Sequence, residues 1–321
     1  MAGEKIVIID RGYASYPYEK TMLEGAGFTL DLFQGERHDR QGKIRFAQEA
    51  VGLLCQWTRI DSEFFDAVPT LKAVVRYGAG FDSIDISAAT ARGVKVANVT
   101  GYADHSVSDH ALALMFACAR ALPLGQQKLK TRFEKPPRNR LFEFKDKTLG
   151  IIGLGSIGKT LCKKAQNLFK DILASDPYLS DEGFIELGAI KAELNTLLAE
   201  SHVISLHCNL TEETNQIIDR EAFRQMQRKP ILINTARGPL VNEEALLEAL
   251  NKNQIHSVGL DVFGDEPPLA NCDELLSHPH VIATGHYAWY SEEAMIELQK
   301  RATKNMLMIL QGKIPEDCLN R

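Results

Sequence analysis

Short runs of apolar, often β-branched residues recur along the whole chain, and each run is followed by a polar segment with the periodicity of a helix. Strands that are apolar on both faces need helices on both sides of their sheet. Alternation of such strands with helices is typical of parallel α/β architecture, so the sequence predicts doubly wound parallel sheets. The predicted strands are KIVIID (5–10), VGLLC (51–55), AVVRYG (73–78), VKVANV (94–99), TLGIIGLG (148–155), DILASD (171–176), HVISLH (202–207), PILINTA (230–236) and SVGLDVF (257–263).

The length and charge of the chain limit its architecture and its partners. With 321 residues, 45% of them hydrophobic, the chain has enough apolar mass for two cores. Its formal net charge of -5 supplies no positive field for nucleic acid or anionic lipid. The longest uncharged apolar run, Ala111 to Ala119, is too short to cross a bilayer. We therefore expect neither a nucleic acid nor a membrane as a partner.

The six cysteines show neither the close spacing of a metal knuckle nor that of a small disulfide framework. The N-terminus leads directly into the first predicted strand and not into a secretory signal. Free thiols and a reducing compartment follow from these two features, so we expect a cytoplasmic protein.

Two further segments organise the chain. Residues 131–147 combine two prolines with dense charge, which predicts an extended connection before a second core begins at Thr148. Residues 291–311 have helical periodicity, with a serine at the start and Gly312 after the end. They predict a long final helix.

A glycine motif follows one predicted strand and opens a predicted helix. Its glycines are Gly153, Gly155 and Gly158, and the next strand ends at Asp176. Such glycines permit a tight turn and close approach of a pyrophosphate to the positive end of the helix, while the acid accepts hydrogen bonds from a ribose. No arginine follows Asp176 directly, so the motif favours NAD over NADP.

Three polar residues follow later predicted strands, where open α/β sheets place their ligands. Arg237 can hold a carboxylate through two parallel charged hydrogen bonds. Glu266 can orient the ring of His286 and stabilise its protonated form, which makes the histidine a general acid and base. Taken singly, these residues have structural alternatives: a surface ion pair, a helix cap and a buried histidine. Their joint occurrence behind a dinucleotide motif indicates hydride transfer between a hydroxyl-bearing and a carbonyl-bearing carboxylic acid.

The chain resembles the D-isomer-specific 2-hydroxyacid dehydrogenases, and within them most resembles the branch that contains the C-terminal binding proteins. The segments that carry the resemblance are VRYGAGFDSIDISAATARGVKVANV, LGIIGLGSIG, SDPYLSDEG, ISLHCNLTEET, LINTARGPLVNEEALLEAL, GLDVFGDEP, HYAWYS and GKIPE. The resemblance implies an α/β fold with two doubly wound parallel-sheet domains. A Rossmann NAD-binding domain (residues 103–287) would be inserted into a flavodoxin-like, discontinuous substrate domain (residues 1–102 and 288–321).

The same resemblance assigns roles to individual residues. Arg237, Glu266 and His286 match the catalytic trio. The backbone amides of Gly78, Ala79 and Gly80 would join Arg237 in holding the substrate carboxylate. The positions expected to line NAD are Gly153, Gly155, Ser156, Ile157, Gly158, Asp176, Cys208, Thr235, Ala236 and Asp261.

Three more residues bear on the substrate. Arg76 is predicted either to meet a distal phosphate or to pair with Asp82 or Asp85. Trp289 is predicted either to wall the side-chain pocket or to belong to a core. Gly285 stands where proline commonly precedes the histidine, which removes a restriction on the backbone that aims it.

No metal site is expected. His202 and His207 bracket a predicted strand without an acidic partner at ligand spacing. His105 and His110 begin a predicted helix without stacking on one face, and the acids beside them are expected to serve the start of that helix.

The leading hypothesis is an NAD-dependent D-2-hydroxyacid dehydrogenase that in reverse reduces a 2-oxoacid, expected to be a homodimer. Its alternatives are an NAD(H)-sensing scaffold like the C-terminal binding proteins and, more specifically, a 3-phosphoglycerate dehydrogenase. The substrate remains open among glyoxylate, hydroxypyruvate, 3-phosphohydroxypyruvate and bulkier 2-oxoacids.

Overall fold

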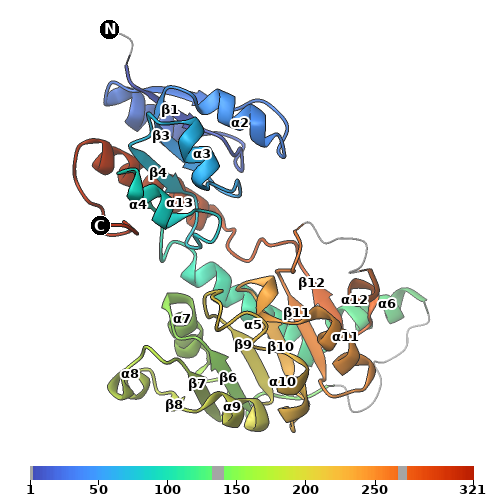
Figure 1. Cartoon of the computed structure of the whole chain (residues 1–321). Helices are drawn as coiled ribbons and strands as arrows, with labels where there is room; N and C mark the ends of the chain where they lie inside the picture. The colour runs from blue at the N-terminus through green and yellow to red at the C-terminus, as the bar shows by residue number, and fades with distance from the viewer. Residues whose placement is uncertain (1–2, 132–140, 267–272) are drawn as a thin grey trace. The chain divides into compact units, whose positions relative to one another are not determined.

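The computed structural model describes residues 3–131, 141–266 and 273–321. The chain divides into two compact units (Figure 1). Unit 1 contains residues 1–102 and 291–321, and unit 2 contains residues 103–290. The middle of the predicted connection at 131–147 lies outside the described residues.

The strands of unit 1 are β1 (Lys5–Ile8), β2 (Thr29–Leu32), β3 (Ala50–Cys55), β4 (Ala73–Arg76) and β5 (Lys95–Ala97). Its helices are α1 (Pro17–Glu19) with the π-helical turn η1 (Lys20–Glu24), α2 (Arg40–Ala47), α3 (Ser62–Ala67), α4 (Ile86–Ala91) and α13 (Glu292–Leu310). The strands of unit 2 are β6 (Thr148–Ile152), β7 (Asp171–Ser175), β8 (Ile190–Lys191), β9 (Val203–Leu206), β10 (Ile231–Asn234), β11 (Ser257–Leu260) and β12 (Val281–Ala283). Its helices are α5 (Asp104–Ala119), α6 (Leu122–Thr131), α7 (Ser156–Ala165), α8 (Asp181–Glu186), α9 (Leu194–Glu200), α10 (Arg220–Gln225), the 3-10 turn η2 (Gly238–Leu240), α11 (Glu243–Asn251) and α12 (Asp273–Ser277).

The sheet of unit 1 is parallel, with the strand order β2-β1-β3-β4-β5. This is the flavodoxin-like order of a doubly wound sheet. Helices α2, α3 and α4 pack on one face through a shared apolar core. Helix α13 covers the other face, where its Met306 lies against the backbone of Gly52 in β3. Both faces are therefore buried, as the apolar strands predict.

The sheet of unit 2 is parallel as well, with the order β12-β11-β10-β9-β6-β7-β8. The order reverses between β6 and β9, which is the switch point of a Rossmann sheet. Helices α5 and α7 share one apolar core with the sheet, and helices α9, α10 and α11 share another on its other side. The predicted fold class is confirmed.

The last helix confirms the prediction made for residues 291–311. The hydroxyl of Ser291 accepts a hydrogen bond from the amide of Ala294 at 3.1 Å, which satisfies a free amide of the first turn. Beyond the helix, Gly312 has a φ of 75°, a left-handed conformation that favours glycine. Of the six cysteines, the five in the described part of the chain are unpaired, and Cys272 lies outside it.

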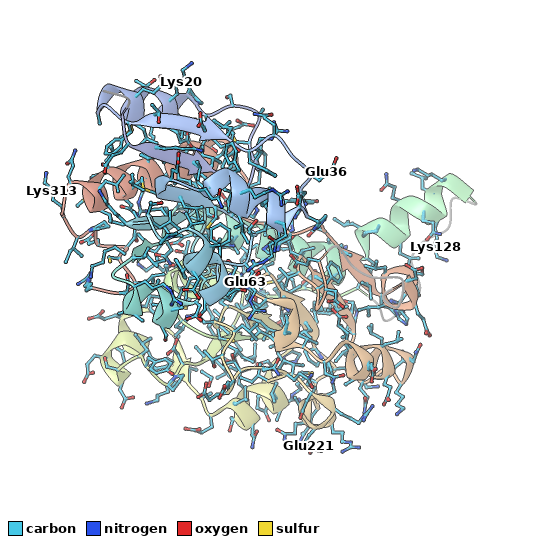
Figure 2. The ribbon with its side chains drawn as sticks, turned by 45° about the horizontal axis from the view of Figure 1, so that its top comes forward. Lys20, Glu36, Glu63, Lys128, Glu221 and Lys313 are labelled. Carbon is cyan, nitrogen blue, oxygen red and sulfur yellow. The ribbon has the colours of Figure 1, made fainter. Side chains whose placement is uncertain are left out.

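Charged side chains such as Lys20, Glu36 and Glu221 project outward from the ribbon (Figure 2). Within the described ranges, no single helix is long and apolar enough to cross a membrane. Helix α5 and the Leu122–Lys130 part of α6 meet that test only together, across a bend of 53°.

Candidate active site

The glycine turn after β6 has the geometry that its sequence predicts. Gly153 has a φ of 92°, and a side chain there would collide with the backbone of Cys208. A side chain at Gly158 would collide with the carbonyl of Gly153, so the helix packs closely on the turn. A side chain at Gly155 would meet nothing within 4 Å. The turn is therefore tight against the sheet and open at Gly155, beside the N-terminus of α7.

Asp176 follows β7 and is held against this turn. Its Oδ2 accepts a hydrogen bond from the amide of Leu154 at 2.6 Å, and its Oδ1 accepts one from the amide of Tyr178 at 2.9 Å. Each carboxylate oxygen has a second lone pair, so the acid can still accept from ribose hydroxyls. At the same edge the hydroxyl of Thr235 is buried without a hydrogen-bond partner in the described chain. An open glycine turn, a fixed acid and an orphaned hydroxyl fit a dinucleotide.

The other predicted cofactor residues lie in the first turn of α7 or shortly after the strands β9 and β10. Ile157, Cys208 and Ala236 are partly buried. Burial raises the pKa of the Cys208 thiol to about 11, so this cysteine is neutral at physiological pH. The hydroxyl of Ser156 donates to Asp104 Oδ1 at 2.9 Å, which ties the start of α7 to α5.

Arg237 extends from the turn after β10. Asn234, buried at the end of β10, braces this turn: its Nδ2 donates to the carbonyl of Arg237 at 2.8 Å, and its Oδ1 accepts from the amide of Ala236 at 3.1 Å. Nη1 of Arg237 donates to the carbonyl of Ala236 at 2.7 Å. The arginine side chain thus extends from a backbone that hydrogen bonds hold in place. Its positive charge lies close enough to Glu266 to lower the pKa of that carboxyl.

Glu266 and His286 form a hydrogen-bonded pair between Oε2 and Nδ1. Burial by itself raises the pKa of Glu266, but the hydrogen bond and charge of His286, the amide of Phe263 and the charge of Arg237 outweigh it, so the pKa is lowered. Because Nδ1 is engaged by the carboxylate, Nε2 is the ring atom left to exchange a proton. The structure thus brings together the three residues predicted to be catalytic.

Trp289 lies in unit 2 close to this pair. Its indole N–H donates to the carbonyl of His286 at 3.1 Å, and its ring packs edge-on against Tyr290. This contact braces the histidine's own backbone, a role that the sequence does not predict.

The predicted carboxylate loop belongs to unit 1 and follows β4. Gly78 has a φ of 133°, and a side chain there would collide with the guanidinium of Arg76. The side-chain amide of Asn98 donates to the carbonyl of Ala79 at 2.6 Å. Asp85 caps α4 by accepting from the amide of Ala88 at 2.8 Å. Arg76 therefore lies against the loop expected to hold a carboxylate.

Sequence reasoning missed the surroundings of α5. Asp104 and Asp109, expected to serve the start of the helix, instead tie α5 to α7: Asp104 accepts from Ser156, and Asp109 pairs with Lys164 at 2.6 Å. His110 contacts Thr284 through Nε2 at 2.9 Å. No short motif signals that contact, because the two residues lie far apart in the sequence.

Comparison with known proteins agrees with this geometry. The family model described as "D-isomer specific 2-hydroxyacid dehydrogenase, NAD binding domain" matches residues 112–288. A glyoxylate reductase of Korarchaeum cryptofilum is 34% identical over 92% of this chain and 90% of its own. A glycerate dehydrogenase of Methylorubrum extorquens is 38% identical over 77% of this chain and 78% of its own. The solved structure of the TT0316 protein from Thermus thermophilus has a TM-score of 0.88 at 29% identity and covers 98% of this chain and 99% of its own.

Proposed function

The chain belongs to the D-isomer specific 2-hydroxyacid dehydrogenases, NAD-dependent oxidoreductases that act on 2-hydroxyacids, and we propose that it reduces small 2-oxoacids with the trio Arg237, Glu266 and His286. NAD supplies the hydride chemistry when bound. We propose that unit 2 holds it through the glycine turn, Asp176 and Thr235, with Ile157, Cys208, Ala236 and Asp261 lining the site. Unit 1 would be the substrate domain.

Arg237 binds the substrate carboxylate in this proposal. A guanidinium presents two parallel N–H donors that match the two oxygens of a carboxylate. The turn braced by Asn234 gives the arginine a fixed origin. The amides of Gly78, Ala79 and Gly80, with Arg76 beside them, would contribute further donors from unit 1.

His286 supplies the proton in this proposal. When a 2-oxoacid is reduced, its carbonyl oxygen gains negative charge, which a protonated imidazole stabilises before it delivers its proton. Glu266 fixes the ring through Nδ1 and so presents Nε2 to the substrate. The observation that carries the proposal is this Glu266–His286 pair with the Arg237 charge close by.

Among 2-oxoacids, we propose glyoxylate and hydroxypyruvate as the substrate class. The glyoxylate reductase and the glycerate dehydrogenase both align with more than three quarters of this chain. The test is a panel of 2-oxoacids, including 3-phosphohydroxypyruvate and bulkier members, with oxidation of NADH followed by absorbance. The highest kcat/KM is expected for glyoxylate or hydroxypyruvate. Absence of turnover across the panel, with NADH still bound, would contradict the proposal and favour a cofactor-sensing scaffold.

We further propose a homodimer. Helices α5 and α6 expose Phe116, Leu122 and Leu129, whose side chains are 41%, 57% and 58% exposed. Apolar side chains gathered on neighbouring helices are typical of an interface. Light scattering after size-exclusion chromatography should give twice the mass of the chain, and Leu129→Glu should shift it toward the monomer.

A cytoplasmic location is also proposed. The described cysteines are all unpaired, which suits a reducing compartment. Fractionation of the native cells should recover the protein with cytoplasmic markers.

A further inference from the structure

The segment that carries His286, residues 284–288, is held by one buried carboxylate. Asp261 follows β11 and is 1% exposed. It accepts hydrogen bonds from the amides of Tyr287 at 3.1 Å and Ala288 at 2.8 Å, and from the hydroxyl of Thr284 at 2.5 Å. These donors lie on both sides of His286 in the chain. One carboxylate therefore fixes the segment before and after the catalytic histidine.

The backbone at His286 needs this support. Its φ is 56°, a left-handed conformation that is unfavourable for a residue with a side chain and persists only where the surroundings enforce it. Its amide donates to the carbonyl of Asp261 at 2.7 Å. The preceding residue is Gly285, whose backbone is intrinsically the least restricted. The conformation that aims the ring is thus imposed by neighbours and not by the local sequence.

His110 of α5 adds a second layer to this support. An ionised carboxylate only accepts, so the single hydrogen of the Thr284 hydroxyl goes to Asp261. The Thr284 oxygen then accepts from His110 Nε2, which is 2.9 Å away. The same imidazole packs edge-on against Tyr287, with the ring centroids 5.4 Å apart. His110 therefore touches the segment on both sides of His286.

We propose that Thr284 and His110 are positioning residues for His286. This inference rests on the proposed role of His286 as proton donor. The threonine hydroxyl directs the Asp261 carboxylate at the segment, and His110 fixes the orientation of that hydroxyl. Without this chain of hydrogen bonds, the segment relaxes from its left-handed turn and the ring loses its alignment, which matters because proton transfer depends strongly on geometry.

The test compares Thr284→Val, which removes the hydroxyl but keeps the shape, with Thr284→Ser, which keeps the hydroxyl. Thr284→Val should lower kcat for 2-oxoacid reduction about tenfold, with KM for the oxoacid nearly unchanged. Thr284→Ser should retain most of the activity. His110→Leu should resemble the valine variant, and His110→Gln, which keeps an Nε2 donor, should be milder. Thr90→Val, an exposed site on α4 in unit 1, is the matched control.

His286→Gln, measured in parallel, separates this inference from the proposed function. If His286→Gln keeps full kcat, the proposed proton donor is wrong. If it loses kcat while Thr284→Val and His110→Leu do not, the positioning inference alone is overturned. Equal losses in Thr284→Val and Thr284→Ser also overturn it, because that result indicates a general structural role. If Thr284→Val does not fold, the comparison of His110→Leu with His110→Gln tests the inference: equal losses of kcat in these two variants would overturn it.

Discussion

Glu266 is a partly exposed acid that its neighbours keep ionised. Burial opposes its charge, but the histidine, the Phe263 amide and Arg237 together lower its pKa. The carboxylate is therefore ionised at every pH above its ordinary value of 4.5, and the pair is lost only when the pH falls through its lowered pKa.

Glu266→Gln should change the pH dependence of reduction. The amide keeps an acceptor for Nδ1 but removes the negative charge, which favours a positively charged neighbour. The alkaline limb of kcat against pH should move toward acid, while part of the activity survives. Glu248→Gln removes a surface acid that pairs with Arg220 and should leave the profile in place. An alkaline limb that does not move would rule out this pair as the proton donor.

Arg237→Ala should lower kcat/KM for the oxoacid about 10- to 100-fold, the equivalent of roughly 1.5 to 3 kcal/mol for a charged hydrogen bond. Arg237→Lys should recover little, because an ammonium cannot make two parallel hydrogen bonds. The Kd of NADH, measured by fluorescence, should change much less in both variants. Arg220→Lys, at a surface ion pair, is the control. Full activity of Arg237→Lys would refute the carboxylate assignment.

Asp176 should set cofactor choice. Its carboxylate, oriented by the amides of Leu154 and Tyr178, favours ribose hydroxyls and repels a 2'-phosphate. We expect kcat/KM to be at least about tenfold higher with NADH than with NADPH, and Asp176→Ser to narrow this ratio. Equal values for the two cofactors in the unmodified protein would contradict the assignment.

The sequence was sufficient to predict the site residues Asp176, Arg237, Glu266 and His286. Each of them follows an apolar strand, and the carboxyl ends of parallel strands meet at one edge of the sheet. It was not sufficient to predict the support of His286. The contacts of Thr284 with His110 and of Trp289 with the His286 carbonyl depend on tertiary packing and on a left-handed backbone at a residue type that rarely adopts one.

At the scale of elements, the strands that sequence reasoning missed are β2, β8 and β12, each the last strand at an edge of its sheet. In β2 (TLDL) exposed and partly buried residues alternate, and β8 has only two residues, both exposed. Central strands are recognised by apolar residues on both faces, a pattern that an edge strand does not need. All the predicted strands are present.

A buried ion pair links three elements of unit 1. Lys43 of α2 lies 2.7 Å from Asp10, which follows β1, and their side chains are 3% and 0% exposed. The other carboxylate oxygen accepts from the amides of Gln56, Trp57 and Thr58 after β3. Burial alone raises the pKa of Asp10, but these partners lower it, so the pair stabilises unit 1 fully above the ordinary pKa of 3.8, and this stability is lost as the pH falls through the lowered pKa.

Lys43→Met should therefore destabilise the protein by about 3 to 5 kcal/mol, since it leaves a buried carboxylate without its cation. Chemical denaturation at neutral pH measures the loss. The control is Lys72→Met at the exposed pair with Glu4, which should cost less than about 1 kcal/mol. Similar losses in the two variants would show that burial does not set the strength of the Asp10 pair.

At the scale of the whole molecule, each unit has its own core and one of the two tryptophans, Trp57 in unit 1 and Trp289 in unit 2. The matched NAD binding domain lies within unit 2. A ligand that binds only the folded state stabilises the part of the protein that holds it, so NAD should stabilise unit 2 against unfolding more than unit 1.

NAD+ at about 100 times its Kd should stabilise unit 2 by roughly 2.7 kcal/mol, which corresponds to about 5 to 10 °C in Tm. Thermal unfolding followed by tryptophan fluorescence can monitor each unit separately. In Trp57→Phe the remaining tryptophan is Trp289, which reports on unit 2, and in Trp289→Phe it is Trp57, which reports on unit 1. The larger shift should appear in Trp57→Phe. A larger shift in Trp289→Phe would argue against NAD binding by unit 2.

The return of the chain to unit 1 has a consequence for synthesis on the ribosome. Helix α13 covers one face of the unit 1 sheet, and after it the amide of Leu319 donates to Val96 in β5. The described strands of unit 2 are complete once residue 290 has emerged, whereas the face of the unit 1 sheet that α13 packs on stays uncovered until α13 has emerged. All of unit 2 separates residues 1–102 from α13 in the sequence, and contacts across such a long separation form slowly. The part of the protein that is translated first is therefore expected to finish folding last, and nascent chains stalled before α13 should expose this apolar face to chaperones.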